Sequence, residues 1–270
     1  MVKKVSIIGG GRIGKLIIKR LIKAYPDIQI LASTKTRESA TRLKNLFPVK
    51  STTDNGEVLS FSDTLFLCIR PDNLKEFLSQ INREVLKSKV VISLLVIFKP
   101  DELSKILKTD KVCVFHPTTY LHYSEREFLK SFIIFSESFS KEEKEKIKNF
   151  LSKAFGYIEE EKDLNSLKEK IFLYGNFPAY LVDFIEKLIL FLSERLKISQ
   201  EESKKLLMDV LKLSMEEMEG IKNSIATPSG ITQRGLKTIQ KVIEELLYSL
   251  ETNTFFKIDK GREKYGKVQR

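Results

Sequence analysis

The chain has 270 residues, of which 42% are hydrophobic, and its 47 lysines and arginines against 36 acidic residues give a formal charge of +11. This length suits two domains and can bury a substantial core. The longest apolar run, Tyr180 to Leu192, is interrupted by charged residues, and the stretch between Lys4 and Gly9 is too short for a signal peptide. These features exclude a membrane-spanning or exported chain and predict a cytoplasmic protein.

The positive charge raises the alternative of a nucleic-acid partner. The charges are spread along the whole chain, and lysine-rich segments such as Lys141–Lys146 carry glutamates as well. Mixed segments of this kind are usually solvated helix faces with weak pairing between residues four apart. We therefore expect no nucleic-acid partner, and we expect the basic surface to favour anionic cofactors and substrates.

The cysteines and histidines give no metal-binding pattern. Cys68 and Cys113 both stand in apolar runs, so we expect two core residues rather than a disulfide. His116 and His122 show no ligand spacing with cysteines, carboxylates or one another. The sequence predicts no metal site.

Short apolar runs alternate with helical stretches through the first half of the chain. A strand of a parallel sheet is buried on both faces and therefore gives a near-continuous apolar run. Six such runs are present, and they are Val5–Ile8, Ile28–Ala32, Thr64–Ile69, Val90–Leu95, Val112–Phe115 and Ser131–Ser136. With a helix over Lys141–Phe155, they predict an α/β domain with a doubly wound parallel sheet in residues 1–160.

Helical periodicity dominates from about Leu164 onward, which predicts an all-helical domain in residues 161–270. Breaks are expected at Tyr174–Pro178, Lys197–Ser199 and Thr227–Gly230. Pro178 is placed in the first turn of one helix, where its missing N–H costs nothing.

The helical half contains a predicted helix start and an apolar stretch that predicts an interface. Ser199 and Glu202 have the spacing of a capping box at the start of a helix. The stretch from Tyr180 to Leu192 is apolar around most of its circumference, which a small helical domain cannot bury alone. We therefore predict a homodimer or larger homo-oligomer formed through these helices.

A glycine-rich turn follows the first strand and opens an amphipathic helix. Gly9 permits the tight turn, Gly11 lets the backbone approach a pyrophosphate, and Gly14 lets the helix pack closely on the strand. Arg12 and Ile13 begin the helix, whose free N–H groups and positive dipole attract phosphates. This strand–turn–helix context predicts a dinucleotide cofactor bound by a Rossmann-type domain.

The end of the second strand distinguishes NAD from NADP. An NAD enzyme usually places an acidic residue there to bind the ribose 2′-hydroxyl, whereas this chain has no acidic residue before Glu38. Hydroxyl groups and cations suit a 2′-phosphate instead. The candidates are Ser33, Thr34, Lys35 and Arg37, and the predicted cofactor is NADP(H).

Several spaced segments resemble pyrroline-5-carboxylate reductase, the last enzyme of proline synthesis. Leu67–Leu74 resembles the family pattern V-K-P-x-x-L, and Gly175–Tyr180 resembles G-S-G-P-A-Y. Ala226–Leu236 resembles T-S-P-G-G-T-T-x-x-G-L. The resemblance covers nearly the whole chain and implies transfer of a hydride from NADPH to the imine carbon of pyrroline-5-carboxylate, a cyclic imino acid.

The resemblance also implies roles for individual residues. Asn55 matches an asparagine that contacts the NADP ribose in the family. Further cofactor-binding residues are implied at two strand ends, and they are Ile69, Arg70, Pro71 and Ser93. At Ala226–Leu236, the backbone of Gly230 and Ile231 is implied to hold the substrate carboxylate.

Thr232 matches a threonine whose hydroxyl lies near the ring nitrogen in the family, which makes it the implied catalytic residue. The alternative for Thr232 is the N-cap of the helix that follows, and the two roles are compatible.

The chain departs from the family where the substrate is expected. Val114–Tyr120 keeps only the proline and one threonine of R-x-M-P-N-T-P, and Phe177 and Ile231 add bulk. Two alternatives therefore stay open, namely reduction of a different small imine and a non-catalytic, NADP-binding regulatory role.

Overall fold

The computed structural model describes residues 2–118, 130–216, 218, 238–240, 242–250 and 252–253. These residues form two compact units, one that extends to Gly175 and a second that begins at Asn176. The sequence-based boundary at residues 160 and 161 stays a prediction. The helix that follows that boundary, α7 (Leu164–Ile171), packs against strand β7 (Ser131–Phe135) within the first unit.

The first unit is built on an eight-stranded sheet with the order β3-β2-β1-β4-β5-β6-β7-β8. The strands are β1 (Lys4–Ile8), β2 (Gln29–Ser33), β3 (Lys50–Thr52), β4 (Thr64–Leu67), β5 (Val90–Ser93), β6 (Val112–His116), β7 (Ser131–Phe135) and β8 (Ile158–Glu160). Neighbours from β3 to β6 are parallel, β7 is antiparallel to β6, and β8 is parallel to β7. The expected doubly wound parallel sheet is therefore confirmed, with two final strands that run in the opposite direction.

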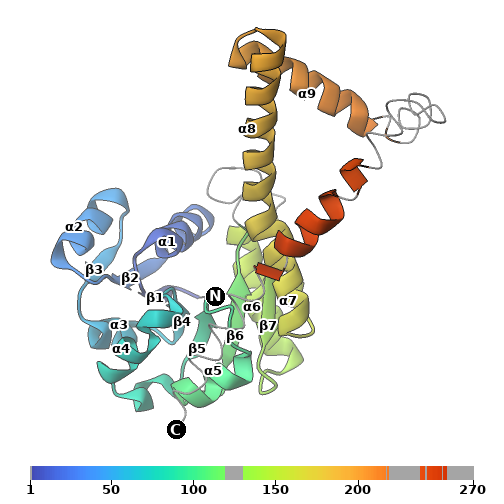
Figure 1. Cartoon of the computed structure of the whole chain (residues 1–270). Helices are drawn as coiled ribbons and strands as arrows, with labels where there is room; N and C mark the ends of the chain where they lie inside the picture. Colours follow the sequence, from blue (N-terminus) through green and yellow to red (C-terminus); the bar gives the residue numbers. More distant parts are fainter. Residues whose placement is uncertain are drawn as a thin grey trace. The chain divides into compact units, whose positions relative to one another are not determined.

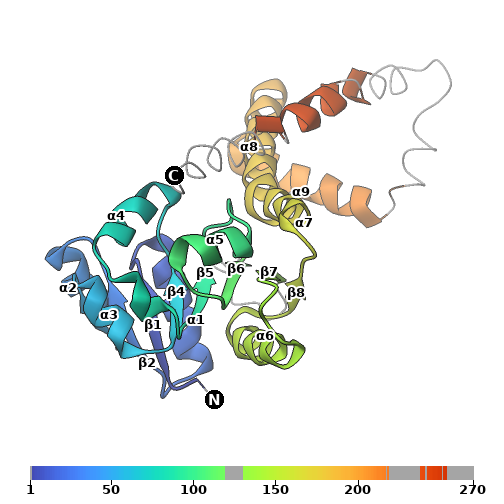
Figure 2. The ribbon, with the colours of Figure 1, turned by 90° about the horizontal axis from the view of Figure 1, so that it is seen from below.

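Helices cover both faces of this sheet (Figure 1). They are α1 (Arg12–Ala24), α2 (Arg37–Leu46), α3 (Asn55–Phe61), α4 (Leu74–Ser79), α5 (Pro100–Leu107), α6 (Lys141–Phe155) and α7 (Leu164–Ile171). Apolar residues of α1, α2 and α6 join one buried cluster with strand residues such as Val5 and Phe115. Those of α3, α4, α5 and α7 join a second cluster with strand residues such as Leu65 and Val114. Figure 2 shows these helices and the sheet from below. Alternate residues of each strand therefore face opposite helix layers, which explains the continuous apolar runs.

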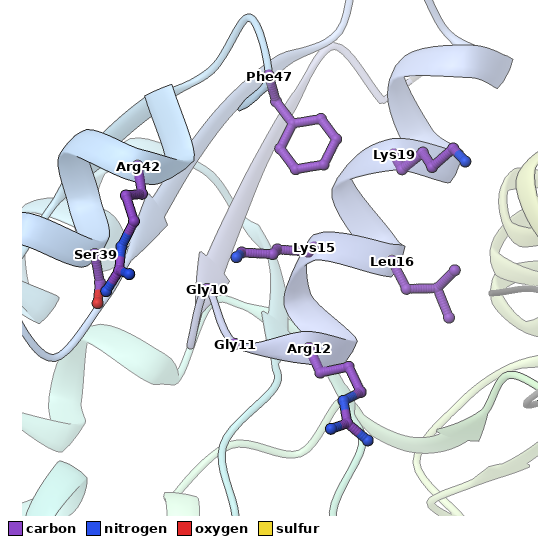
Figure 3. Close-up of a pocket in the computed structure, with 9 residues that line it drawn as sticks. All are labelled: Gly10, Gly11, Arg12, Lys15, Leu16, Lys19, Ser39, Arg42 and Phe47. Carbon is purple, nitrogen blue, oxygen red and sulfur yellow. The ribbon is translucent and has the colours of Figure 1, made fainter. Parts of the chain in front are cut away.

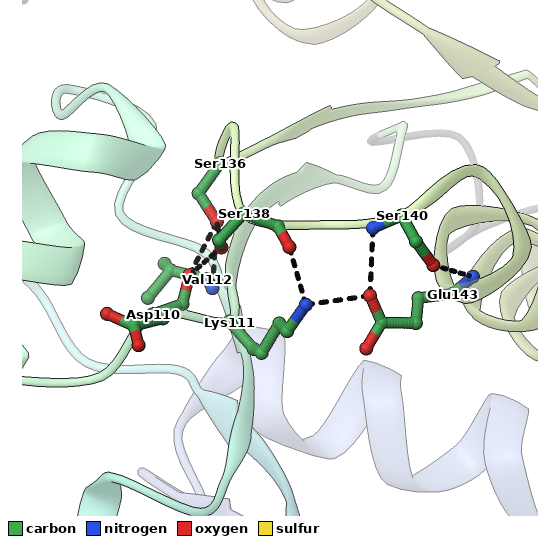
Figure 4. A network of polar contacts seen from close by, with 7 residues as sticks. All are labelled: Asp110, Lys111, Val112, Ser136, Ser138, Ser140 and Glu143. Carbon is green, nitrogen blue, oxygen red and sulfur yellow. Dashed lines mark hydrogen bonds and ion pairs between the residues drawn. The ribbon is translucent and has the colours of Figure 1, made fainter.

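A polar network connects the start of α6 to Lys111, the residue directly before β6 (Figure 4). Ser140 and Glu143 form a capping box, in which the Ser140 Oγ accepts a hydrogen bond from the Glu143 N–H and the Glu143 carboxylate accepts one from the Ser140 N–H. The Lys111 Nζ lies 2.7 Å from the Glu143 Oε2 and also donates to the Ser138 carbonyl. The helix predicted over Lys141–Phe155 forms with those bounds.

The described residues of the second unit form helices, with the predicted break at Lys197–Ser199 between the first two. Its helices α8 (Phe177–Leu196) and α9 (Gln200–Glu216) pack against each other, and Pro178 lies in the first turn of α8 as predicted. The predicted capping box is present, because Ser199 and Glu202 exchange hydrogen bonds between side chain and backbone. None of the helices in the described residues has the length and apolar character that a membrane span needs.

The structure differs from the sequence-based expectations at β3, at β8, at the turn before α8 and at Cys68. The short strands β3 and β8 were not predicted, because each has three residues and few of them are apolar. The break expected at Tyr174–Pro178 is a π-helical turn over Phe172–Asn176 that joins α7 to α8. Cys113 is buried in the core as expected, whereas Cys68 is only partly buried and lines a cleft.

We expect Glu143→Gln to lower the melting temperature at neutral pH, because the variant loses the charged partner of Lys111. Hydrogen bonds from Lys111 and from the Ser140 backbone lower the pKa of Glu143 to about 2. Since the folded pKa lies below that of a free glutamate, the contribution to stability is present above the free pKa and is lost as the pH falls. Melts by circular dichroism should therefore show the difference from wild type narrowing below pH 4.5 and vanishing near pH 2.

Glu169→Gln is a matched control, because Glu169 is an exposed residue of α7 outside this network. A difference between Glu143→Gln and wild type that stays constant with pH would contradict the proposed role of the carboxylate charge.

Candidate functional site

The glycine-rich turn between β1 and α1 is shaped by close backbone contacts. Gly9 has a φ of +102°, and a Cβ on it would lie 2.6 Å from the Cys68 carbonyl oxygen. A Cβ on Gly14 would lie 2.0 Å from the Gly9 carbonyl oxygen, so only glycine allows α1 to start this close to β1. The N–H groups of Gly9 and Gly10 both donate to the Ser33 carbonyl, which ties the turn to the end of β2.

Gly11 differs from its neighbours because a Cβ on it would meet no atom within 4 Å. It is the N-cap of α1, and within the described residues no side chain caps the first turn of the helix, which has no acidic residue. By contrast, Thr36 caps α2 and Asp54 caps α3. The first N–H groups of α1 are thus left for an anionic ligand, which the helix dipole also favours.

An open cleft of 840 Å³ lies beside this turn, at the carboxyl ends of the strands. The strand order reverses between β1 and β4, with β2 and β3 on one side of β1 and β4, β5 and β6 on the other. Ligands of open α/β sheets bind in the crevice at such a reversal. The cleft and the uncapped start of α1 therefore lie where a dinucleotide would bind.

Most of the cofactor-binding residues predicted from the sequence line this cleft. They are Gly9, Gly11, Arg12, Ile13, Ser33, Thr34, Lys35, Asn55, Ile69 and Arg70. Gly14 lies beneath the turn and packs on Gly9. Arg37, Pro71 and Ser93 are not part of the lining, and their contact with the cofactor stays a prediction.

The polar side chains of the cleft make contacts both across the cleft and within its walls. The Lys35 Nζ lies 3.6 Å from the Glu76 Oε2, so the loop after β2 reaches α4. The Asn55 Nδ2 donates to the Gln80 Oε1 over 2.8 Å. Ser33 and Thr34 are buried, and the Thr34 hydroxyl donates to the Thr36 carbonyl. These contacts give the cleft a defined polar wall at the end of β2 and a second one on α3 and α4.

Other lining residues were not predicted from the sequence. They are Ile8, Gly10, Ser39, Thr53, Cys68, Asn73, Glu76, Phe77, Gln80 and Leu94. Asn73, Glu76, Phe77 and Gln80 recur at helical spacing, so the periodicity of α4 could have indicated one shared face. Ser39 gives no such signal, because it reaches the cleft through the packing of α2 beside the turn.

The end of β6 holds two buried polar atoms without a hydrogen-bond partner in the described part of the chain. They are the Nε2 of His116 and the Oγ1 of Thr118. Burial lowers the pKa of His116 to about 4, so its imidazole is neutral at physiological pH. A Cβ on Gly175 would lie 3.4 Å from the His116 Nε2, which places the imidazole against the π-helical turn.

The predicted substrate residues Gly230, Ile231 and Thr232 lie outside the described residues. Where residues are described, no group of three or more histidines, cysteines and carboxylates is placed to hold a metal ion.

A doubly wound sheet with a bare, uncapped helix start in the crevice at its strand reversal is the arrangement in which many nucleotide-dependent enzymes bind their cofactor. The model of the family described as "NADP oxidoreductase coenzyme F420-dependent" matches residues 4–97 and supports the same class. The chain is accordingly an NAD(P)H-dependent oxidoreductase, and the prediction of NADP(H) as its cofactor is confirmed at the level of this family.

Three comparisons show which enzymes the chain resembles. The chain is 32% identical over 78 residues to a pyrroline-5-carboxylate reductase of Corynebacterium melassecola, which covers 28% of this chain and 29% of the relative. It is 22% identical over 266 residues to pyrroline-5-carboxylate reductase 2 of Bacillus subtilis, which covers 92% of each chain. The solved Plasmodium falciparum pyrroline carboxylate reductase with NADP bound has the same fold, with a TM-score of 0.71, 20% identity and coverage of 96% and 97%. The chain is thus similar over most of its length to pyrroline-5-carboxylate reductases, at modest identity.

The glycine turn gives a paired prediction. Gly14→Ala should destabilise the fold by about 1–3 kcal/mol, because its Cβ collides with the Gly9 carbonyl. Gly11→Ala should lower the free energy of unfolding by less than about 1 kcal/mol, since its Cβ has open space and only the N-cap changes. Instead, Gly11→Ala should weaken NADPH binding roughly tenfold, because the Cβ stands in the cleft.

Urea unfolding measures the free energy of unfolding of both variants, and a titration of cofactor fluorescence measures their affinity for NADPH. Each variant serves as the control for the other. Unchanged NADPH affinity in Gly11→Ala would show that the bare backbone of this turn does not contact the cofactor.

Proposed function

We propose that this protein uses NADPH to reduce the imine of pyrroline-5-carboxylate to the secondary amine of proline. The observation that carries the proposal is the bare, uncapped start of α1 in the cleft. It occurs in a chain that aligns with a pyrroline-5-carboxylate reductase over 92% of both lengths. The cleft supports the cofactor, and the alignment supports the substrate.

Different residues of the cleft suit the pyrophosphate, the ribose and the 2′-phosphate of NADP(H). The N–H groups at the start of α1 suit the pyrophosphate, since no side chain of the described residues caps them. Asn55, on the opposite wall, suits a ribose hydroxyl. The chain has no acidic residue between Ser33 and Arg37, so no carboxylate of that segment repels a 2′-phosphate.

The protein has few chemical tasks in this reaction. NADPH, when bound, supplies the hydride that the imine carbon accepts, and the imine nitrogen gains a proton. The chain must orient the imine carbon and deliver that proton. We assign the substrate carboxylate to the backbone N–H groups of Gly230 and Ile231, and the proton transfer to the hydroxyl of Thr232, directly or through water.

A second candidate is reduction of a different small imine. His116, Pro117 and Thr118 stand at the end of β6, where the family pattern has Met, Pro and Asn. The unpartnered polar atoms of His116 and Thr118 make this strand end chemically different from that pattern. Such a change at the carboxyl edge of the sheet favours a substrate with altered shape or polarity.

We also propose that α8 binds a second copy of the chain. None of the 20 residues of α8 is buried in the single chain. Leu181, Phe184 and Phe191 are 45%, 47% and 53% exposed, and their spacing places them along one face. An apolar stripe of this kind on a helix is typical of a protein–protein interface.

Purified protein mixed with NADPH and pyrroline-5-carboxylate should oxidise the cofactor and produce proline in equal amounts. The loss of absorbance of the reduced cofactor measures its oxidation, and amino-acid analysis measures the proline formed. A cyclic imine without the carboxylate is the control substrate, and it should react more slowly because it lacks the group assigned to Gly230 and Ile231.

Thr232→Ala is the variant for the same assay, and it should lower kcat on the order of 100-fold while leaving NADPH affinity unchanged. NADPH binding without turnover of any imine would contradict the reductase proposal and support a regulatory role. Faster turnover of the control imine would favour the second candidate.

For the proposed interface, light scattering after size-exclusion chromatography should give at least twice the 31.2 kDa mass of one chain. Phe184→Glu combined with Phe191→Glu should reduce this mass, because two charges then enter the apolar stripe. Glu194→Ala, an exposed change on the same helix, should leave the mass unaltered. A wild-type protein of single-chain mass would exclude the interface.

A further inference from the structure

A second pocket lies between α1 and α2, with a volume of 570 Å³ (Figure 3). Four cationic side chains line it, and its lining includes no acidic residue. The cations are Arg12, Lys15 and Lys19 of α1 and Arg42 of α2. We call this the basic pocket.

The charges of the basic pocket are poorly neutralised by the protein itself. Arg12, Lys15 and Lys19 form no ion pair with any residue that the structure describes. The Arg42 Nη2 lies 3.5 Å from the Glu38 Oε1, but these side chains are 64% and 78% exposed. Exposed pairs of this kind are weak, so a multiply charged anion can displace Glu38 from Arg42. The basic pocket is therefore suited to an anion from outside the chain.

The basic pocket is continuous with the cofactor cleft. The two share Gly10, Gly11, Arg12 and Ser39, which are the turn itself and one residue of α2. Figure 3 shows the Lys15 side chain directed from α1 toward α2, with Ser39 and Arg42 on the facing side of the pocket. Polar groups from both helices thus surround the space next to the turn.

The residues first predicted to recognise the 2′-phosphate are less well placed. Lys35 pairs with Glu76 across the cleft, and Arg37 lines neither the cleft nor the basic pocket. Arg42 and Lys15 line the basic pocket, and neither was predicted from the sequence.

We propose that the basic pocket receives the 2′-phosphate of NADP(H), and that Arg42 and Lys15 make the protein prefer NADP(H) to NAD(H). A phosphate monoester carries nearly two negative charges near neutral pH, and the arginine guanidinium binds it with two parallel hydrogen bonds. NAD(H) lacks this group and leaves the cations of the pocket unneutralised. The inference rests on the proposed function only for the nicotinamide cofactor and is independent of the imine.

The first experiment titrates wild type and variants of the full chain with NADPH and with NADH, following cofactor fluorescence without any imine. Arg42→Ala and Lys15→Ala should each raise the Kd for NADPH about tenfold or more, because each removes a charged hydrogen bond. The Kd for NADH should change less than about twofold. Lys44→Ala, an exposed change on α2 outside both pockets, is the matched control and should alter neither value.

Arg37→Ala compares the two assignments directly. We expect its NADPH affinity to match that of wild type. A large loss in Arg37→Ala with none in Arg42→Ala would overturn the inference, and so would equal losses for NADPH and NADH in Arg42→Ala. Melting temperatures close to wild type confirm that the variants are folded.

A second readout uses fragments of the cofactor in calorimetry. Adenosine 2′,5′-bisphosphate should bind wild type more tightly than adenosine 5′-monophosphate, and Arg42→Ala should abolish this preference. Inorganic phosphate tests the other source of the same chemistry, a separate phosphate ligand. Phosphate that binds through Arg42 without competing with NADPH would overturn the inference.

The two proposals fail in different ways. Absence of imine turnover with an intact NADPH preference removes the proposed reaction and leaves this inference standing. Imine turnover with no preference for NADPH over NADH removes this inference and leaves the reaction standing.

Discussion

The close approach of α1 to β1 is the contact on which the rest of the site depends. A Cβ on Gly14 would lie 2.0 Å from the Gly9 carbonyl, so the helix can begin directly over the end of the strand only because that side chain is absent. This position brings the N–H groups of the first helical turn to the crevice at the strand reversal. Because no side chain caps the helix, those groups and the helix dipole are available to a phosphate. The same glycine turn therefore contributes to the stability of the fold and to the proposed binding of the cofactor.

The surroundings of that turn are positively charged, because the cations of the basic pocket lie beside it. The excess of basic residues belongs to the whole chain, but the packing of α1 beside α2 concentrates four cations in one pocket without acidic lining residues. On other surfaces lysines and glutamates pair, as Lys144 does with Glu160. Paired surface charges contribute little, whereas Arg12, Lys15 and Lys19 have no ion pair in the described residues and can attract an anion to this cavity. The positive charge of the chain is therefore suited to a phosphorylated cofactor at the basic pocket, where four of the cations lie together.

The two halves of the proposed reaction are supported by different parts of the molecule. The cofactor half rests on the described first unit, where the glycine turn, Asn55 and the walls of the cleft can each be tested by binding alone. The substrate half rests on the family alignment and on Gly230, Ile231 and Thr232, which are outside the described residues. The altered end of β6, with a neutral His116, is the feature of the described structure that bears on substrate choice.

The sequence by itself determined the strands that are buried on both faces, the helix over Lys141–Phe155, the capping box at Ser199 and the glycine turn. Each of these has a local cause, such as a continuous apolar run, a cap three residues from its partner or a glycine at a fixed spacing. The three-residue strands β3 and β8 could not be predicted, because their pairing comes from neighbouring strands rather than from their own composition. The basic pocket was decided only by tertiary structure. Lys15 and Arg42 lie on different helices, and they line one cavity because the sheet packs those helices side by side.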